Sequence, residues 1–158
     1  KQAKKYLKPI KGNAEKRLPV PNESFNVVVA SEIIEHLLHP ENLLKETERV
    51  LVKGGYAIIT MPNTASIQMR LSLLLWGRCP TLNYAQNKNH IRFYDLSDIK
   101  YLIQKPQLRI EKVRGGGFLS FSKVNFPAYI PIPRLIRVIG GDLFPQISRG
   151  LIIVLRKV

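Results

Sequence analysis

Two glutamates and a histidine that could do acid–base or metal chemistry stand close together early in the chain. Glu32, Glu35 and His36 come shortly after an unbroken apolar run that ends at Ala30. In one helix, Glu32 and His36 would lie four residues apart on the same face, which suits joint binding of a cation, and His36 could instead be a general base. The plainer interpretation makes Ser31 the N-cap of this helix and the glutamates ordinary first-turn or surface residues.

The elements that would position these residues form a strand–helix–strand unit. Residues 27–30 and 56–61 are short apolar runs without polar alternation, which is typical of strands buried on both faces of a parallel sheet. Residues 40–51 between them carry a helical apolar pattern. Ligands of open α/β sheets bind beyond the carboxyl ends of the strands, and these ends are residues 31–32 and 61–63.

Further elements follow the same patterns. Asp95 is the expected cap of an amphipathic helix over residues 95–103. Residues 109–113 alternate like a strand, and residues 151–155 indicate a final buried strand. The pair Gly54-Gly55 predicts a turn from helix to strand, at the sheet edge opposite the ligand crevice.

In this order, the chain resembles the second half of the class I S-adenosylmethionine-dependent methyltransferases, over residues 2–101. The segments that carry the resemblance are Gly12-Asn13-Ala14-Glu15, Leu18-Pro19, Ser24-Phe25-Asn26, residues 32–37, residues 49–55, Met61-Pro62-Asn63 and residues 90–96. The resemblance implies an α/β fold with a Rossmann-like, mainly parallel sheet, flanking helices and an antiparallel last strand. That last strand is expected beside the strand that ends at Met61.

The resemblance also implies S-adenosylmethionine as cofactor, and methyl transfer to an acceptor by direct displacement at the sulfonium methyl group. Because that methyl group is already activated, proximity and in-line alignment can do most of the work. His36 is the candidate catalytic residue, as a base that is needed only if the acceptor must lose a proton. No metal site is predicted, because the two or three ligands near His36 fall short of a secure site.

Asn13, Ala14, Ser31 and Glu32 are the residues that the resemblance assigns to cofactor binding. The family usually has an aspartate at the position of Asn13, where it accepts a hydrogen bond from the adenine amino group. An asparagine can still accept through its amide oxygen. The alternative is a simple loop residue, since Gly-Asn is a common turn pair.

Asn63, His90 and Arg92 are the candidate substrate-binding residues. Asn63 lies at the expected crevice, and the other two precede the helix over residues 95–103. Near the mouth of a pocket, His90 and Arg92 could bind an anionic group of the substrate. A capping or solvated role is the alternative for both.

The front half of the family's domain is not found in this sequence. Residues 1–8 are typical of the tail of a helix that ends at Pro9, and no G-x-G stretch precedes Gly12. The first strands are therefore expected to be missing, which would leave an exposed sheet edge. On this hypothesis the chain alone is inactive.

The whole chain, residues 1–158, is interpreted as a single partial domain with insertions at residues 66–89 and 118–148. Both insertions are apolar and flanked by arginines. They suggest a lid over an apolar substrate or a contact with a membrane surface. A cap on the core or a dimer interface explains them equally well.

The charge balance is unusual, with 25 Lys and Arg against 11 Asp and Glu, a net charge of +14. This excess favours anionic partners, unless it only reflects a generally basic proteome or is balanced by an acidic segment elsewhere. The single cysteine, Cys79, excludes an internal disulfide and fits a reducing compartment. With no recognisable signal peptide and an apolar stretch at 71–76 far too short to span a bilayer, a cytoplasmic protein is predicted.

Two rival functions stay open at this level. One is a methyltransferase-like binding module without catalysis, and the other is a basic protein that associates with anionic membrane or nucleic acid. The expected substrate is a small molecule or a lipid, nucleic acid is not excluded, and the sequence leaves an oligomer open.

Overall fold

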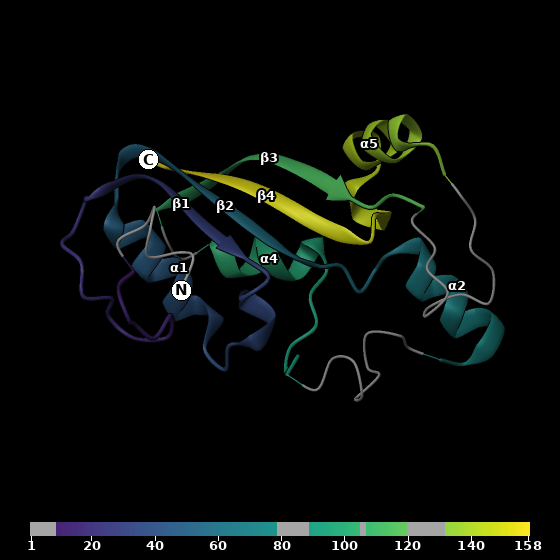
Figure 1. Ribbon diagram of the computed structural model, residues 1–158, viewed down its shortest axis with the longest axis horizontal. Coiled ribbons are helices and arrows are strands. Elements are labelled where there is room, and N and C mark those ends of the chain that lie inside the picture. The colour runs from purple at the N-terminus through teal and green to yellow at the C-terminus, as the bar shows by residue number, and fades with distance from the viewer. Residues whose placement is uncertain (1–8, 79–88, 105–106, 120–131) are drawn as a thin grey trace.

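The computed structural model describes residues 9–78, 89–104, 107–119 and 132–158. Within these residues, four strands form one sheet with helices on both faces (Figure 1). In chain order the elements are β1 (Phe25–Ser31), the 3-10 helix η2 (Ile34–His36), α1 (Pro40–Val50), β2 (Leu51–Pro62), α2 (Ile67–Trp76), α4 (Leu96–Ile103), β3 (Leu108–Gly116), α5 (Arg134–Leu143), the 3-10 helix η4 (Pro145–Ile147) and β4 (Gly150–Lys157).

The strand order is β1-β2-β4-β3, so the last strand of the chain is inserted between two earlier ones. β1 pairs with β2 in parallel, while β4 is antiparallel to both of its neighbours. β1, β2 and β3 therefore run in one direction and only β4 runs against them. This arrangement confirms the predicted α/β fold, including the antiparallel last strand beside the strand that ends at Met61.

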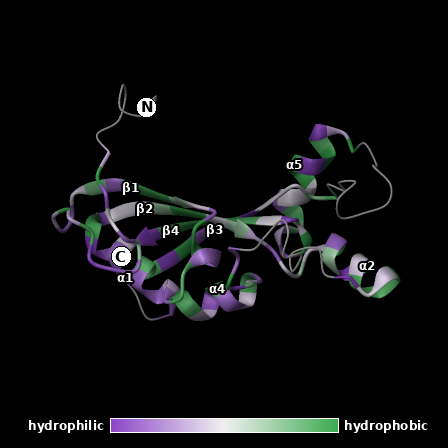
Figure 2. Cartoon of the chain, turned by 60° about the horizontal axis from the view of Figure 1, so that its bottom comes forward, coloured by the Kyte–Doolittle hydropathy of each residue, from purple (hydrophilic) through white to green (hydrophobic). Residues whose placement is uncertain are grey.

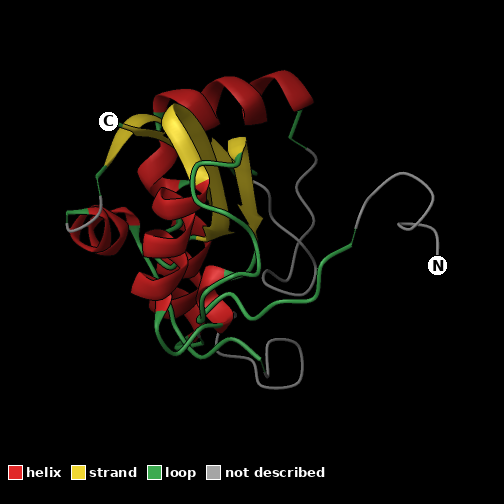
Figure 3. Cartoon of the chain, turned by 90° about the vertical axis from the view of Figure 1, so that its left-hand side faces the viewer, coloured by secondary structure: helices red, strands yellow, loops and turns green. Residues whose placement is uncertain are grey.

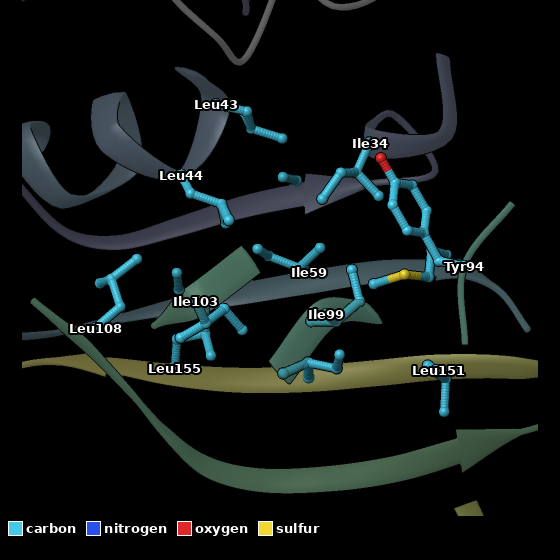
Figure 4. Close-up of a cluster of buried hydrophobic side chains, with 14 of the residues drawn as sticks. Ile34, Leu43, Leu44, Ile59, Tyr94, Ile99, Ile103, Leu108, Leu151 and Leu155 are labelled. Carbon is cyan, nitrogen blue, oxygen red and sulfur yellow. The ribbon is translucent and has the colours of Figure 1, made fainter. Parts of the chain in front are cut away.

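The hydrophobic core lies between the sheet and two helices, α1 and α4, which cover the same face (Figures 1 and 3). Leu44 of α1, Ile59 of β2, Ile99 of α4 and Ile153 of β4 are all 0% exposed. Figure 4 shows such side chains meeting between the helices and the sheet. Full burial of a side chain of this size stabilises a fold by about 1.5–3 kcal/mol.

The two core helices begin where the sequence predicts. Pro40 occupies the first turn of α1, where its missing N–H is not needed. Asp95 caps α4 through a capping box, in which its carboxylate accepts from the N–H groups of Ser97 and Asp98 and the Asp98 carboxylate accepts from the Asp95 N–H.

β1 is buried on one face only, which corrects the prediction of two buried faces for residues 27–30. Val27 and Val29 are 52% and 62% exposed, whereas Ala30 points into the core and is 7% exposed. Successive side chains of a strand point to opposite faces of the sheet. Among the described residues, the helix on the face away from the core is α5, and this helix packs on β3. The apolar run indicated a strand correctly, but not what covers it.

The pair Gly54-Gly55 lies inside β2 and not in a turn before it, which corrects a second prediction. β2 starts at Leu51, directly after α1. Its pairing with β1 jumps from Phe25–Leu51 to Val27–Tyr56, so the register of the two strands is irregular over this stretch. Gly54 adopts φ +77°, a conformation that glycine adopts without strain, and so allows the irregular stretch.

The two predicted insertions contain α2 and α5. Ser66 caps α2 by accepting from the Met69 N–H, and Gly77, at φ +60°, ends it. Residues 79–88 and 120–131 of the insertions lie outside the described residues, as does the helix tail predicted at 1–8. Among the described residues, no helix is long and apolar enough to cross a membrane. The predicted compartment stays a prediction.

Candidate functional site

Three polar side chains join the carboxyl ends of β1 and β2. The Thr60 hydroxyl donates to Glu32 Oε1 at 2.9 Å, and the hydroxyls of Ser31 and Thr60 lie 2.8 Å apart. Because Thr60 has one hydroxyl proton, Ser31 is the donor in the second bond. Ser31 is the last residue of β1, and η2 has Ile33 at its cap position without a side-chain bond, so the predicted N-cap role of Ser31 is wrong.

Glu32 follows β1 in a left-handed backbone conformation, at φ +50°. Such a conformation is uncommon for a residue other than glycine and is often found at functional sites. Its N–H donates to the Thr60 carbonyl oxygen at 3.0 Å, which fixes the turn. The predicted cofactor-binding residues Ser31 and Glu32 are thus held as one exposed unit at the end of the sheet.

The single turn of η2 replaces the helix that was expected to begin after Ser31 and to hold both Glu32 and His36. Glu32 and His36 therefore do not share a helix face. Instead, Glu35 and His36 meet His90, because the N–H groups of Ile91 and Arg92 both donate to the Glu35 carbonyl oxygen at 3.1 Å. These two hydrogen bonds hold η2 and the segment that contains His90 next to each other, although the two are far apart in the sequence.

The two histidine rings both lie near the Glu35 carboxylate. His36 Nε2 lies 3.8 Å and His90 Nε2 lies 3.9 Å from Glu35 Oε1. The ring centroids are 4.7 Å apart, with the rings edge to face. His36 Nδ1 lies 2.7 Å from the carbonyl oxygen of Asn89. The site therefore offers two imidazoles and one carboxylate within a small volume.

Glu35 is 2% exposed, which is unusual for a carboxylate. Among the described residues, its Oε2 atom is buried without a hydrogen-bond partner. Burial is the largest effect and raises the pKa of the Glu35 carboxyl, while a hydrogen bond from its own backbone is the next largest and lowers it. The Glu32 charge raises the pKa and the His36 and His90 charges lower it, each by less. Burial therefore favours the neutral form of this carboxyl.

Tyr94 lies next to this cluster but contributes no base. Its hydroxyl is buried beside Ile34 (Figure 4) and, within the described residues, lacks a hydrogen-bond partner. Burial raises the pKa of the Tyr94 hydroxyl to about 12. The phenol therefore stays neutral at physiological pH.

Arg92 and Asn63, both predicted to bind substrate, bond to the chain itself. Arg92 donates to the carbonyl oxygens of Leu37, at 3.3 Å, and Leu38, at 2.6 Å, and so closes the end of η2. Asn63 is 1% exposed, and its amide nitrogen donates to two backbone carbonyl oxygens. The geometry gives both side chains a structural role.

Asn13 and Ala14 lie in a turn that is fixed to the start of α1. Asn13 Oδ1 accepts from the Glu15 N–H at 2.8 Å, and Glu15 Oε1 accepts from the His39 N–H at 2.7 Å. Because α1 begins just after η2, this turn lies at the same end of the sheet as Glu32. Asn13 is exposed, while Ala14 packs against the core.

Comparison with known proteins decides the family. A family model described as a methyltransferase domain matches residues 3–113. The chain belongs to this methyltransferase domain family. The ubiquinone biosynthesis O-methyltransferase of mouse mitochondria is 26% identical over 100 residues, which are 63% of this chain and 27% of that protein. The chain thus spans about a quarter of the length of this curated relative.

Solved structures of other methyltransferases share the fold. A Thermotoga maritima S-adenosylmethionine-dependent methyltransferase, described as a possible histamine N-methyltransferase, has a TM-score of 0.63 at 24% identity, covering 94% of this chain and 63% of that one. A second, from Archaeoglobus fulgidus, has a TM-score of 0.61 at 18% identity, covering 94% of this chain and 66% of that one. The likeness shows the fold alone.

The methyltransferase family implies S-adenosylmethionine as cofactor. The residues present fit one part of such a site. Asn13 supplies an exposed amide, and Ser31 with Glu32 supplies exposed oxygens after a left-handed turn, at the sheet end where ligands of α/β folds bind. A hydroxyl, a carboxylate and an amide can meet the amino and hydroxyl groups of a nucleoside.

Glu35 is the site residue that sequence reasoning undervalued. Its place in the sequence fits a surface residue, yet it is the most buried member of the cluster. One signal was present: Ile34 before it and Leu37 after it are apolar, which indicates a buried segment. Its meeting with His90 depends on the loop before α4, for which the sequence offered no pattern.

Proposed function

We propose that the protein transfers the methyl group of S-adenosylmethionine to a small-molecule or lipid acceptor. The observation that carries the proposal is the family match, which spans the turn of Asn13, the end of β1 and the histidine cluster. When bound, S-adenosylmethionine supplies a methyl group that its sulfonium charge already activates. The residues of this chain then need only to bind, orient and, for some acceptors, remove a proton.

In this proposal Asn13 accepts a hydrogen bond from the adenine amino group, and Ser31 and Glu32 face the remainder of the cofactor. His36 stays the candidate base. A backbone carbonyl can only accept, so the 2.7 Å contact with Asn89 places a proton on His36 Nδ1. In the neutral ring, Nε2 then carries the lone pair that could take a proton.

Calorimetric titration with S-adenosylhomocysteine tests the cofactor role, using the protein in the length that its gene encodes. We expect saturable binding that Asn13→Ala and Glu32→Gln each weaken about tenfold, the loss of one good hydrogen bond or about 1.4 kcal/mol. Glu111→Gln, on the exposed side of β3, is the matched control and should bind normally. If the full-length protein does not bind, the enzyme proposal fails in favour of a non-catalytic module.

A second candidate function is association with an anionic lipid surface. The helices α2 and α5 both lie toward the same end of the molecule, apart from each other (Figures 1 and 2). Both expose apolar side chains, including Leu74 at 79% and Leu135 at 69%. Exposed Arg134 and Arg137 lie among the apolar residues of α5. Apolar area beside arginines is typical of helices that lie in the headgroup region of a bilayer.

Flotation with vesicles tests this surface. We expect binding to vesicles of phosphatidylglycerol with phosphatidylcholine, weak binding to phosphatidylcholine alone, and a loss of binding as salt rises. The double variant Leu74→Ser with Leu135→Ser should weaken binding at least about tenfold, since each burial contributes roughly 1.5–3 kcal/mol. Tyr101→Ser, which changes a side chain of α4 that is 68% exposed, is the control. Equal binding by all variants contradicts the proposal.

A further inference from the structure

A cleft lined by basic side chains lies at the end of the sheet opposite the candidate functional site. The start of β2, the start of β3 and the end of β4 form this basic cleft, whose volume is about 380 Å³. Ser31 and Thr60 stand at the other end of β1 and β2. The proposed methyl transfer therefore makes no use of the basic cleft. Four of its lining side chains are cationic: Lys53, Arg109, Arg156 and Lys157.

Two of these cations lie directly opposite each other. Arg109 of β3 and Arg156 of β4 are cross-strand partners, and both are exposed. Their chain neighbours Leu108 and Leu155 are buried in the core, so the two arginines point to the other face of the sheet. Like charges directly opposite each other destabilise a sheet. Such a conflict with a local rule is expected where a residue serves function and not stability.

Within the described residues, neither arginine of this pair has a carboxylate at ion-pair distance. The ion pairs that arginine and lysine side chains form in this part of the chain belong to other residues. Glu111 lines the same cleft but joins none of these pairs. Lys157 is partly neutralised, because its Nζ donates to Glu23 Oε1 at 3.1 Å and to the Leu51 carbonyl oxygen at 2.8 Å. The basic cleft thus keeps an excess of positive charge that the protein leaves unpaired.

The guanidinium of Arg156 is held in place by β2. Its central carbon lies 5.7 Å from the centroid of the Tyr56 ring, a cation–π contact. A Cβ added at Gly54 would lie 4.0 Å from Arg156 Nη2, so the irregular stretch of β2 brings Lys53 and Gly54 beside the same guanidinium. A cation that is already positioned loses less conformational freedom when a ligand binds.

We propose that the basic cleft binds the phosphate groups of a small, soluble anion such as an oligophosphate. The planar fork of a guanidinium matches the geometry of a phosphate, and two of them with Lys53 can surround one anionic group. The volume of the cleft falls within the range of small-molecule sites, roughly 300–1,000 Å³. The net charge of +14 adds a long-range attraction for any anion.

The surroundings of the basic cleft favour a compact anion over a macromolecule. Glu111 and the 60% exposed Glu23 stand at its sides, where they would repel an extended chain of phosphates such as RNA. A lipid surface is disfavoured by position. The cleft lies near the end of β4, at the far end of the molecule from α2 and α5 (Figures 1 and 2). A bilayer in contact with those two helices would not reach it.

Calorimetric titration with tripolyphosphate tests the proposal, using the protein in the length that its gene encodes, at about 0.15 M salt. We expect saturable binding of one equivalent. The double variant Arg109→Gln with Arg156→Gln should weaken binding about 100-fold, because the loss of each charge-assisted hydrogen bond costs about tenfold. Glu111→Gln should strengthen binding about two- to fivefold, the usual size of one exposed charge interaction. Absence of saturable binding, or equal binding by the double variant, overturns the proposal.

The double variant Lys45→Gln with Lys100→Gln is the matched control. It removes the same charge from exposed positions of α1 and α4, away from the basic cleft. It should bind tripolyphosphate like the wild type. If it weakens binding as much as the arginine variant does, the attraction belongs to the overall charge and the proposal fails.

Thermal unfolding separates a binding role of the arginines from a structural one. Arg109→Gln removes the like-charge opposition and keeps the contact of Arg156 with Tyr56, so without ligand its Tm should be no lower than that of the wild type. Tripolyphosphate should raise the Tm of the wild type more than that of this variant. A lower Tm of the unliganded variant would assign Arg109 to the fold and overturn the proposal.

An oligouridylate RNA and vesicles of phosphatidylglycerol identify the source of the phosphate. We expect neither to show binding that depends on Arg109 and Arg156. If the two arginines matter for RNA or for vesicles but not for tripolyphosphate, the cleft serves that partner and the proposal of a small anion is wrong. The proposal does not rest on methyl transfer, so its failure and a failure to bind S-adenosylhomocysteine are separate results.

Discussion

Gly141→Ala should lower the free energy of unfolding by about 3 kcal/mol, the upper end of the usual range for overpacking. Gly141 lies in α5 where the helix crosses β3, and a Cβ added there would overlap the carbonyl oxygen of Gly115 and lie 3.0 Å from its carbonyl carbon. Both partners are backbone, so no side chain can rotate away. Helix propensity alone predicts the opposite sign, because alanine stabilises a helix by up to about 1 kcal/mol relative to glycine.

Gly116→Ala is the control, and urea unfolding measures the stability of both variants. A Cβ at Gly116 would lie 3.9 Å from the Gly150 carbonyl oxygen, which is ordinary contact. We expect this variant to differ from the wild type by less than about 1 kcal/mol, the usual cost of a surface or strand glycine change. Equal stability of the Gly141→Ala variant and the wild type would show that α5 does not pack on β3 as described.

The strands and helices could be predicted because their signals are local. The apolar runs at 27–30 and 56–61, Pro40 and the Asp95 cap each act within a few residues, and each lies where the sequence placed it. The one-sided burial of Val27 and Val29 could not be predicted, because burial depends on which helices cover the opposite face. The irregular stretch of β2 at Gly54-Gly55 could not be predicted for a similar reason, because glycines suit turns and irregular strand positions alike.

The sequence could predict where in the fold the candidate site lies, but not which side chains form it. The rule that ligands bind at the carboxyl ends of strands puts Ser31 and Glu32 correctly at the end of β1. It does not say which polar side chains point outward there. Asn63 and Arg92 stand at the right positions, yet they bond to backbone carbonyl oxygens. Glu35 entered the site because a 3-10 turn, unlike the expected helix, brings it toward His90.

Asn63→Ala should lower the free energy of unfolding by about 3 kcal/mol, because it removes three hydrogen bonds of about 1 kcal/mol each from a buried place. The Asn63 amide nitrogen donates to the carbonyl oxygens of Gln146, at 3.0 Å, and Ser148, at 2.8 Å. Its amide oxygen accepts from the Ala65 N–H at 3.0 Å. The residue thus ties the end of β2 to the segment before β4. Urea unfolding measures the loss, with the exposed Asn13→Ala as control.

Asn63→Asp separates this structural role from the predicted substrate contact. The new oxygen would face two carbonyl oxygens, so the variant should be less stable than Asn63→Ala at pH 7. The same repulsion should raise the pKa of the introduced carboxyl in the folded state above its unfolded value of about 3.9. Because the pKa is raised in the folded state, the loss of stability relative to the wild type grows as pH rises through that pKa. The loss is smaller below that pKa, where the protonated acid can donate one hydrogen bond. If both variants unfold like the wild type at pH 7 and pH 4, Asn63 does not support the fold, and its contact with substrate becomes the better interpretation.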